Sequence, residues 1–209
     1  MAMFSKDLGI DLGTMFTRLA DGTQVLLNEP TIVAIEVLDQ KMVAVGQEAK
    51  DMYGRVPESI EVARPLKNGV IADYEITETL LSYLLQRVSG SMRIFRPRVM
   101  ITVPYGVTSV ERRAVYEAVL EAGSRDASLI QQPLAAALGV DLPINSPSGN
   151  MVICLGGGCT EAAVMAMYGI VSAETLRAGG MELDEAIVNY VRRKYGVVIG
   201  QATAEQLKM

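Results

Sequence analysis

Short runs of β-branched and aliphatic residues alternate along this chain with longer segments whose apolar residues recur every three or four positions. Each short run is bounded by Gly, Pro or Asn and is typical of a β-strand. The runs that predict strands are Asp7–Leu12, Thr31–Glu36, Lys41–Val45, Arg98–Val103, Met151–Leu155, Glu161–Met167 and Ile170–Thr175. Their alternation with helical segments indicates an α/β protein.

The helical segments carry start signals and apolar faces. A helix begins at Thr108, where Glu111 completes a capping box, and another begins with Pro133. Between residues 76 and 88, helical spacing predicts an apolar face made by Ile76, Leu80, Leu81, Leu84, Leu85 and Val88. A last helix covers residues 183–194, and its spacing places inward the side chains of Leu183, Ile187, Tyr190 and Val191.

One turn motif occurs twice. Residues 11–14 (DLGT) end the first strand, and residues 154–160 (CLGGGCT) end the first strand after a turn-rich linker, Pro143 to Gly149. Both motifs have the order strand, Leu-Gly turn, Thr, strand. We therefore expect two domains of related design, each presenting a glycine turn to a common cleft.

Glycine turns let backbone N–H groups approach an anion, and consecutive amides form a concave phosphate site. A turn on each side of a cleft would clamp a polyphosphate. The first turn adds Asp11, a carboxylate suited to hold Mg²⁺ through water, and the hydroxyl groups of Thr14 and Thr17. Taken alone, residues 11–14 also fit an ordinary hairpin corner. Neither the P-loop nor the dinucleotide-binding glycine pattern occurs in the chain.

Composition removes other classes of function. The chain has 209 residues and no histidine, which excludes His-dependent catalysis and His-ligated metal sites. Its net charge of −5 argues against a nucleic-acid partner. Cys154 and Cys159 stand five apart, which fits neither a redox pair nor a zinc site and indicates a reducing compartment. No signal-peptide pattern opens the chain, and its most apolar window, residues 151–171, contains glycines and Glu161. We expect a cytoplasmic protein.

Longer segments follow one another along the chain in a familiar order: KDLGIDLGT, LLNEPTIVAI, AVGQEAKDM, RPLKNGVIADYEIT, PRVMITVP, VERRAV, EAGSRDASLIQQPLAAALG, PSGNMVICLGGGCTE and LDEAIVNYVRRKYGVVIG. In these segments the chain resembles the MreB family, the bacterial actin-like proteins of cell-shape control. The resemblance implies an α/β, actin-like (ribonuclease H-like) two-lobe ATPase fold with ATP and Mg²⁺ between the lobes. It also implies membrane-associated filaments that organise cell-wall synthesis, with partners such as MreC and RodZ.

Under this resemblance, residues 1–145 form the first lobe, complete apart from its C-terminal helices, with a small inserted subdomain over about residues 31–64. Residues 146–209 begin a truncated second lobe, whose sheet would have an exposed edge and whose adenosine side of the cleft would be missing. Gln132 stands where the family positions the attacking water. The implied nucleotide-binding residues are Asp11, which also faces Mg²⁺ through water, Gly13, Thr14, Met15, Phe16, Gly156, Gly157, Gly158, Cys159 and Thr160.

Several residues depart from the family pattern. Cys154 replaces an Asp that contacts Mg²⁺-bound water, and a thiol is a poor ligand for a hard cation. Gln132 replaces a Glu, so it can orient water by hydrogen bonding but cannot act as a base. Met15, Phe16 and Cys159 replace small or hydroxyl residues beside the phosphates. We therefore expect nucleotide binding to persist and hydrolysis to be impaired.

An arginine-flanked apolar pair suggests a membrane contact. Residues 79–110 contain no Asp or Glu, while arginines surround Ile94 and Phe95. Such a tip suits attachment to an anionic leaflet. By composition alone the pair fits equally well a loop that folds back into the core. The MreB resemblance favours insertion, because that family inserts an apolar loop here, and it implies a position at the inner face of the cell membrane.

Two other functions fit the same residues. A small-molecule kinase of the same superfamily would use the cleft to transfer phosphate. A non-catalytic, truncated remnant would instead modulate intact filaments.

Overall fold

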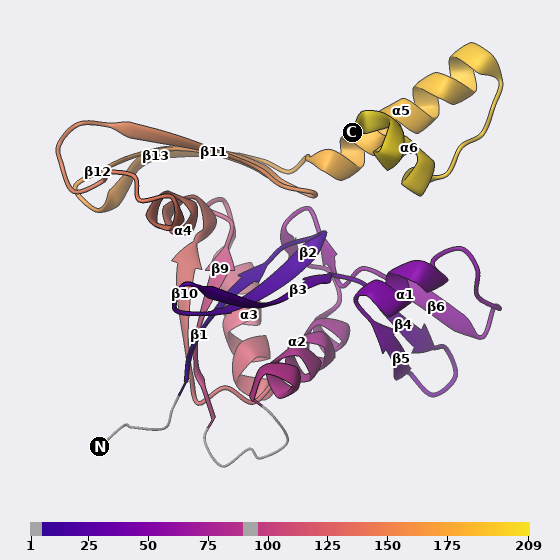
Figure 1. Cartoon of the computed structure of the whole chain (residues 1–209), viewed down its shortest axis with the longest axis horizontal. Coiled ribbons are helices and arrows are strands. Elements are labelled where there is room, and N and C mark those ends of the chain that lie inside the picture. Colours follow the sequence, from indigo (N-terminus) through magenta and orange to yellow (C-terminus); the bar gives the residue numbers. More distant parts are fainter. Residues whose placement is uncertain (1–5, 90–95) are drawn as a thin grey trace.

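The computed structural model describes residues 6–89 and 96–209. The pair Ile94 and Phe95 lies outside the described residues, so its insertion into a membrane stays a prediction. Among the described residues, none of the helices has the length and apolar character needed to cross a membrane. Figure 1 shows two sheet-containing parts, one above the other, with a smaller sheet beside the lower part.

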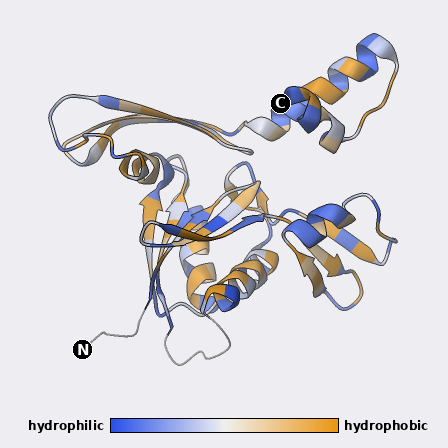
Figure 2. Cartoon of the chain, viewed as in Figure 1, coloured by the Kyte–Doolittle hydropathy of each residue, from blue (hydrophilic) through white to orange (hydrophobic). Residues whose placement is uncertain are grey.

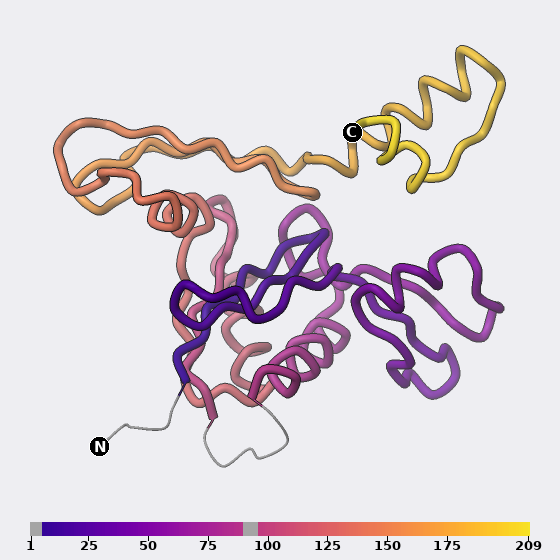
Figure 3. Tube along the Cα trace, viewed as in Figure 1, coloured from indigo at the N-terminus to yellow at the C-terminus, as the bar shows by residue number. Residues whose placement is uncertain are grey.

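The larger sheet has five strands in the order β10-β9-β1-β2-β3. Its strands are β1 (Asp7–Leu12), β2 (Phe16–Asp21), β3 (Gln24–Pro30), β9 (Arg98–Val103) and β10 (Asp126–Gln131). The chain trace in Figure 3 shows β1 beside the much later β9, to which it runs parallel. Because β1, β9 and β10 are parallel, their carboxyl ends meet at one edge of the sheet. The turn after β1 and the residue after β10, Gln132, therefore lie at the same edge.

Helices α2 (Tyr74–Ser89) and α3 (Ser109–Glu121) cover one face of this sheet. Alternate residues of β1, such as Leu8 and Ile10, point into the core and meet the predicted apolar face of α2, where Leu80 and Leu84 are fully buried. The predicted capping box of α3 is confirmed. The Thr108 hydroxyl accepts a hydrogen bond from the Glu111 N–H at 3.2 Å, and the Glu111 carboxylate accepts one from the Thr108 N–H at 2.7 Å.

A small sheet in the order β5-β4-β6 lies within the range predicted for the inserted subdomain. It comprises β4 (Val33–Glu36), β5 (Lys41–Val45) and β6 (Ile60–Ala63), and α1 (Gln47–Met52) packs on it around a core of Ile32, Ala34 and Ala49. A short hairpin of β7 (Leu66–Lys67) and β8 (Val70–Ile71) follows.

The second sheet is a meander of β11 (Asn150–Leu155), β12 (Thr160–Ala166) and β13 (Gly169–Leu176). Helix α4 (Gln132–Gly139) packs on one face of it through Ala137. The predicted linker is not a free connection, because its residue Ile144 is only 3% exposed and packs with Ala163 and Met165. The second sheet thus shares a core with the end of the first part.

The other face of the second sheet is apolar and exposed. Met151, Ile153 and Leu155 of β11 are 60%, 60% and 81% exposed, and β11 and β13 are edge strands, as predicted. Figure 2 shows hydrophobic residues also along α5 (Gly180–Tyr195), which packs against α6 (Gln201–Lys208). The prediction for α5 was wrong in part, since Leu183 and Tyr190 are exposed. The short helix α6 covers only part of the surface of α5.

Candidate functional site

The two predicted glycine turns have the same backbone geometry. In the hairpin of β1 and β2, the Gly13 N–H donates to the Phe16 carbonyl at 3.2 Å. In the hairpin of β11 and β12, the Gly156 N–H donates to the Cys159 carbonyl at 2.9 Å. The cross-strand pairs also correspond, because Asp11 lies opposite Arg18 as Cys154 lies opposite Glu161. The repeated sequence motif therefore encodes a repeated hairpin.

These turns face each other directly. A Cβ atom added to Gly158 would stand 2.5 Å from the Thr14 hydroxyl oxygen, and one added to Gly157 would overlap the Met15 side chain. No side chain larger than that of glycine fits this approach. The two turns therefore touch at Gly157 and Gly158, and the cavity beside these contacts corresponds to the predicted common cleft.

The first turn is braced by buried hydroxyl groups. Thr31 donates from its hydroxyl to the Gly13 carbonyl at 2.7 Å and is hydrogen-bonded to the Thr17 hydroxyl at 2.8 Å. The Thr14 hydroxyl accepts a hydrogen bond from the Gly69 N–H at 3.0 Å. Because Thr17 is fully buried and paired with Thr31, its expected role as a hydroxyl donor to a ligand is wrong. It stabilises the turn instead.

A cavity of about 410 Å³ opens between the turns, which is within the range of small-molecule sites. Gln132, at the start of α4, is in its wall. Besides Thr17, the predicted residue Thr160 is not in the lining, and its hydroxyl donates to the Ala178 carbonyl at 2.9 Å. The other predicted residues all line the cavity: Asp11, Gly13, Thr14, Met15, Phe16, Gly156, Gly157, Gly158 and Cys159.

Helices α5 and α6 form a further wall of the cavity, which the sequence reasoning did not predict. The Gly180 and Met181 N–H groups donate to the carbonyls of Gly156 and Gly157 at 3.0 and 2.8 Å, so the start of α5 is tied to the second turn. Lys208 of α6 pairs with the buried Asp184 of α5 at 2.8 Å. Glu205, one turn earlier on α6, lines the same cavity.

No local pattern marks Asp184, Glu205 and Lys208 as site residues. A carboxylate and a lysine on polar helix faces are ordinary surface features in a sequence. Only the tie between α5 and the second glycine turn brings them to the cavity.

Asp11 is the carboxylate placed at the first turn. Its Oδ1 accepts a hydrogen bond from the Thr102 hydroxyl at 3.0 Å, and its Oδ2 pairs with Arg18 at 3.1 Å. Within the described ranges, no three His, Cys, Asp or Glu side chains are grouped so that they could hold a metal ion. Mg²⁺ in nucleotide sites is commonly held by one or two carboxylates, waters and the phosphates themselves. Asp11 fits that mode, in which the phosphates supply most of the ligands.

Both cysteines are neutral thiols at ordinary pH. Burial and the neighbouring Glu161 carboxylate raise the pKa of Cys154, and the same causes raise the pKa of Cys159 to about 11. Neither cysteine is in a disulfide. Cys154 therefore brings a weakly polar, uncharged group to the cavity that Asp11 also lines.

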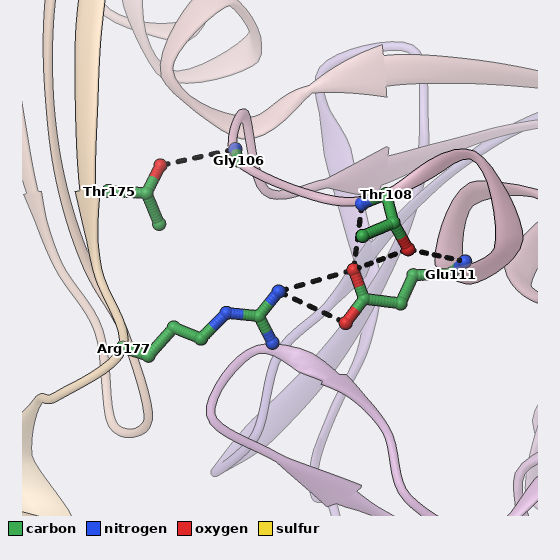
Figure 4. Close-up of polar contacts among 5 residues, drawn as sticks. All are labelled: Gly106, Thr108, Glu111, Thr175 and Arg177. Carbon is green, nitrogen blue, oxygen red and sulfur yellow. Dashed lines mark hydrogen bonds and ion pairs between the residues drawn. The ribbon is translucent and has the colours of Figure 1, made fainter.

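A chain of polar contacts holds the two parts in register beside the cavity. The buried Glu161 accepts hydrogen bonds from the Tyr105 N–H at 2.6 Å and the Thr175 hydroxyl at 3.1 Å. The same Thr175 hydroxyl accepts from the Gly106 N–H at 3.2 Å, as Figure 4 shows. Burial raises the pKa of Glu161, and the two hydrogen bonds only partly offset that effect.

Comparison with known proteins identifies this arrangement. The sequence model of the MreB/Mbl protein family matches residues 5–209. The chain belongs to the MreB/Mbl family. It is 48% identical over 212 residues to the cell shape-determining protein MreB of Escherichia coli (strain K12), covering 99% of this chain and 61% of that protein. It is 41% identical to the cell shape-determining protein Mbl of Bacillus subtilis (strain 168), covering 99% and 62%.

Solved structures agree with the fold. MreB5 of Spiroplasma citri bound to ADP superposes with a TM-score of 0.90 at 32% identity, covering 98% of this chain and 62% of that one. The MamK double helical filament superposes with a TM-score of 0.80 at 21% identity, which supports the fold alone. The chain has the actin-like fold of this cytoskeletal family. It spans about three fifths of the length of the relatives that it matches.

Proposed function

We propose that this chain binds ATP between its two glycine turns and is a subunit of an MreB-type, cell-shape-determining filament. The observation that carries the proposal is the pair of matching turns that face each other across a cavity of about 410 Å³. The similar MreB5 of Spiroplasma citri was solved bound to ADP and to AMPPNP, which supports the choice of ligand.

The residues divide the work of binding. Backbone N–H groups of the two turns would face the phosphates, because glycine leaves them open to an anion. Asp11 would hold Mg²⁺ through water, and Mg²⁺ when bound neutralises charge on the terminal phosphates. Glu205 and Lys208 would meet the nucleoside end, since they line the cavity from α6 and belong to neither glycine turn.

We expect hydrolysis to be slow. Gln132 lines the cavity and can orient a water molecule, but its amide cannot remove a proton. Cys154 lines the same cavity as Asp11 but is a neutral thiol, so it supplies no second carboxylate. Phosphoryl transfer depends on positioning and electrostatic stabilisation, and both are weakened.

Nucleotide binding is tested by titrating a fluorescent ATP analogue into the purified chain with Mg²⁺. Gly158→Ala should weaken binding at least tenfold, because the added Cβ would meet the Thr14 hydroxyl at 2.5 Å. Gly139→Ala is the matched control, since nothing lies within 4 Å of a Cβ there. Equal affinity of both variants and the parent would contradict binding between the turns.

Filament assembly is tested by sedimentation and electron microscopy with ATP. Filaments of the chain alone support the main proposal. Pelleting only together with an intact MreB would favour the modulating role. Phosphate transfer to a small molecule, without filaments, would favour a kinase.

We further propose that filaments attach to the inner membrane surface through Ile94 and Phe95 and so guide cell-wall synthesis with MreC and RodZ. The support is the run of residues 79–110 without Asp or Glu. Two of the flanking arginines have partners, since Arg87 pairs with Glu29 at 2.7 Å and Arg98 with Asp7 at 2.6 Å. Apolar burial of the pair would therefore contribute more to attachment than charge.

A further inference from the structure

Arg18 enters the cavity because of the register of the first hairpin. It lies directly opposite Asp11 on the neighbouring strand, so the two side chains share one face of the sheet. That face borders the cavity, and Arg18 is part of its lining. A guanidinium therefore stands beside the first glycine turn.

Two contacts hold this guanidinium in place. Its NH1 donates to the Asp11 carboxylate at 3.1 Å, and its central carbon lies 5.8 Å from the centre of the Phe16 ring. Both contacts restrain the long Arg18 side chain before any ligand binds, so it has less rotamer freedom to lose on binding. The Arg18 side chain is still 48% exposed, so part of the guanidinium remains open to the cavity and to solvent.

The other lining cation is less available to an anion. Lys208 pairs with Asp184 at 2.8 Å and donates to the Gly180 carbonyl at 3.1 Å, and its side chain is 28% exposed. Cys154, which lines the same cavity, adds no negative charge. Among the described residues that line this cavity, Arg18 is therefore the more exposed cation.

We propose that Arg18 binds the phosphates of the nucleotide and lets the site hold ATP even without Mg²⁺. This inference rests on the proposed nucleotide binding. A guanidinium matches phosphate with two parallel hydrogen bonds and keeps its charge at every physiological pH. Because Asp11 takes only one of the five guanidinium N–H donors, Arg18 keeps donors for the phosphates while it stays paired, and the Asp11 carboxylate keeps acceptor sites for water bound to Mg²⁺. Arg18 and Mg²⁺ thus share the neutralisation of phosphate charge.

The test measures the affinity of the whole chain for ATP, with Mg²⁺ and with EDTA. The parent should lose less than about tenfold in affinity when Mg²⁺ is removed. Arg18→Leu should bind roughly 10- to 100-fold more weakly than the parent in EDTA, the effect of losing a charged hydrogen-bonding group. Arg18→Lys should fall between them, because it keeps the charge and loses the paired geometry. Arg113→Leu, at an exposed surface ion pair on α3, is the matched control and should bind as the parent does.

A second readout separates a phosphate contact from a general structural effect. Inorganic tripolyphosphate should compete with ATP for the parent and much less for Arg18→Leu, whereas adenosine should compete equally for both. Equal affinity of Arg18→Leu and the parent for ATP in EDTA would overturn the role of Arg18. So would a loss of adenosine competition in Arg18→Leu as large as its loss of tripolyphosphate competition. If the parent binds no nucleotide with Mg²⁺ either, the proposed function fails and this inference fails with it.

Discussion

Arg177, just after β13, pairs with Glu111 at the start of α3 at 3.0 Å, and so joins the second sheet to the first part of the chain. Figure 4 shows that the same Glu111 carboxylate also completes the capping box with Thr108. One side chain thereby couples the start of α3 to the second sheet.

Substitutions at Glu111 should separate these two roles. Glu111→Gln keeps a capping acceptor and loses the ion pair, so it should lower the free energy of unfolding by about 0–1 kcal/mol. Arg177→Gln should lower it by a similar amount, because both side chains of the ion pair are partly exposed. Glu111→Ala loses the cap as well and should cost about 0.5–2 kcal/mol more. Urea unfolding measures each change. Equal costs for the two Glu111 variants would show that the cap contributes nothing.

The same residue predicts a loss of stability in acid. The Thr108 N–H, above all, lowers the pKa of Glu111 below 4.5, with further help from the Thr108 hydroxyl and Arg177. A carboxyl group with a lowered folded-state pKa stabilises the fold above its unfolded pKa, and this contribution disappears as pH falls through the folded pKa. The difference in stability between the parent and Glu111→Gln should therefore shrink below about pH 4.

Glu161 should show the opposite dependence on pH. Burial raises its folded-state pKa above 4.5, so its contribution is complete below the unfolded pKa and is lost as pH rises through the folded value. Glu161→Gln should be at least as stable as the parent at pH 7 and should flatten this dependence. Glu161→Ala should cost about 1–3 kcal/mol, because the Tyr105 N–H loses its acceptor. Thermal unfolding from pH 4 to 8 tests both expectations.

A matched pair of isoleucines compares the two sheets. Ile101 in β9 is fully buried and Ile153 in β11 is 60% exposed. Ile101→Ala should cost about 2–5 kcal/mol, the usual cost of a core cavity, and Ile153→Ala less than about 1 kcal/mol. Amide hydrogen exchange should likewise be slow in β9 and faster in β11. Similar protection in both strands would indicate that the apolar face of β11 is covered in solution.

Restoring two carboxylates should raise the rate of ATP hydrolysis. Cys154→Asp adds a group that can face Mg²⁺-bound water, and Gln132→Glu adds a base at the start of α4. We expect phosphate release near background in the parent and a clear rise only in the double variant. A parent that already releases phosphate as fast as the double variant would show that Gln132 suffices.

Membrane attachment should depend on the apolar pair. Each large side chain contributes up to about 1.5–3 kcal/mol on burial, so replacing Ile94 and Phe95 by Ser should abolish co-flotation with anionic liposomes. Circular dichroism should show an unchanged fold. Arg113→Leu serves as a control that changes charge elsewhere on the surface. Flotation of the double Ser variant at the level of the parent would rule out insertion.

The sequence alone determined the features that arise within a few residues of one another. The two glycine turns, the Thr108 capping box and the apolar face of α2 were predicted correctly, because a turn, a cap and a helix face each depend on neighbours along the chain. The repeated Leu-Gly-Thr pattern also predicted the common cleft. Strands β3 and β10 were not predicted, since their polar residues obscure the strand pattern that pairing with β2 and β9 imposes.

Only the tertiary structure decided which distant groups share the cavity. Arg18 faces Asp11 through strand register. Lys208 reaches the cavity because α6 packs on α5, whose first N–H groups are held by the carbonyls of Gly156 and Gly157. The exposure of Leu183 was likewise set by how little of α5 is covered by α6. These outcomes depend on contacts between elements far apart in the chain, and a local pattern of apolar and polar residues carries no record of which elements meet.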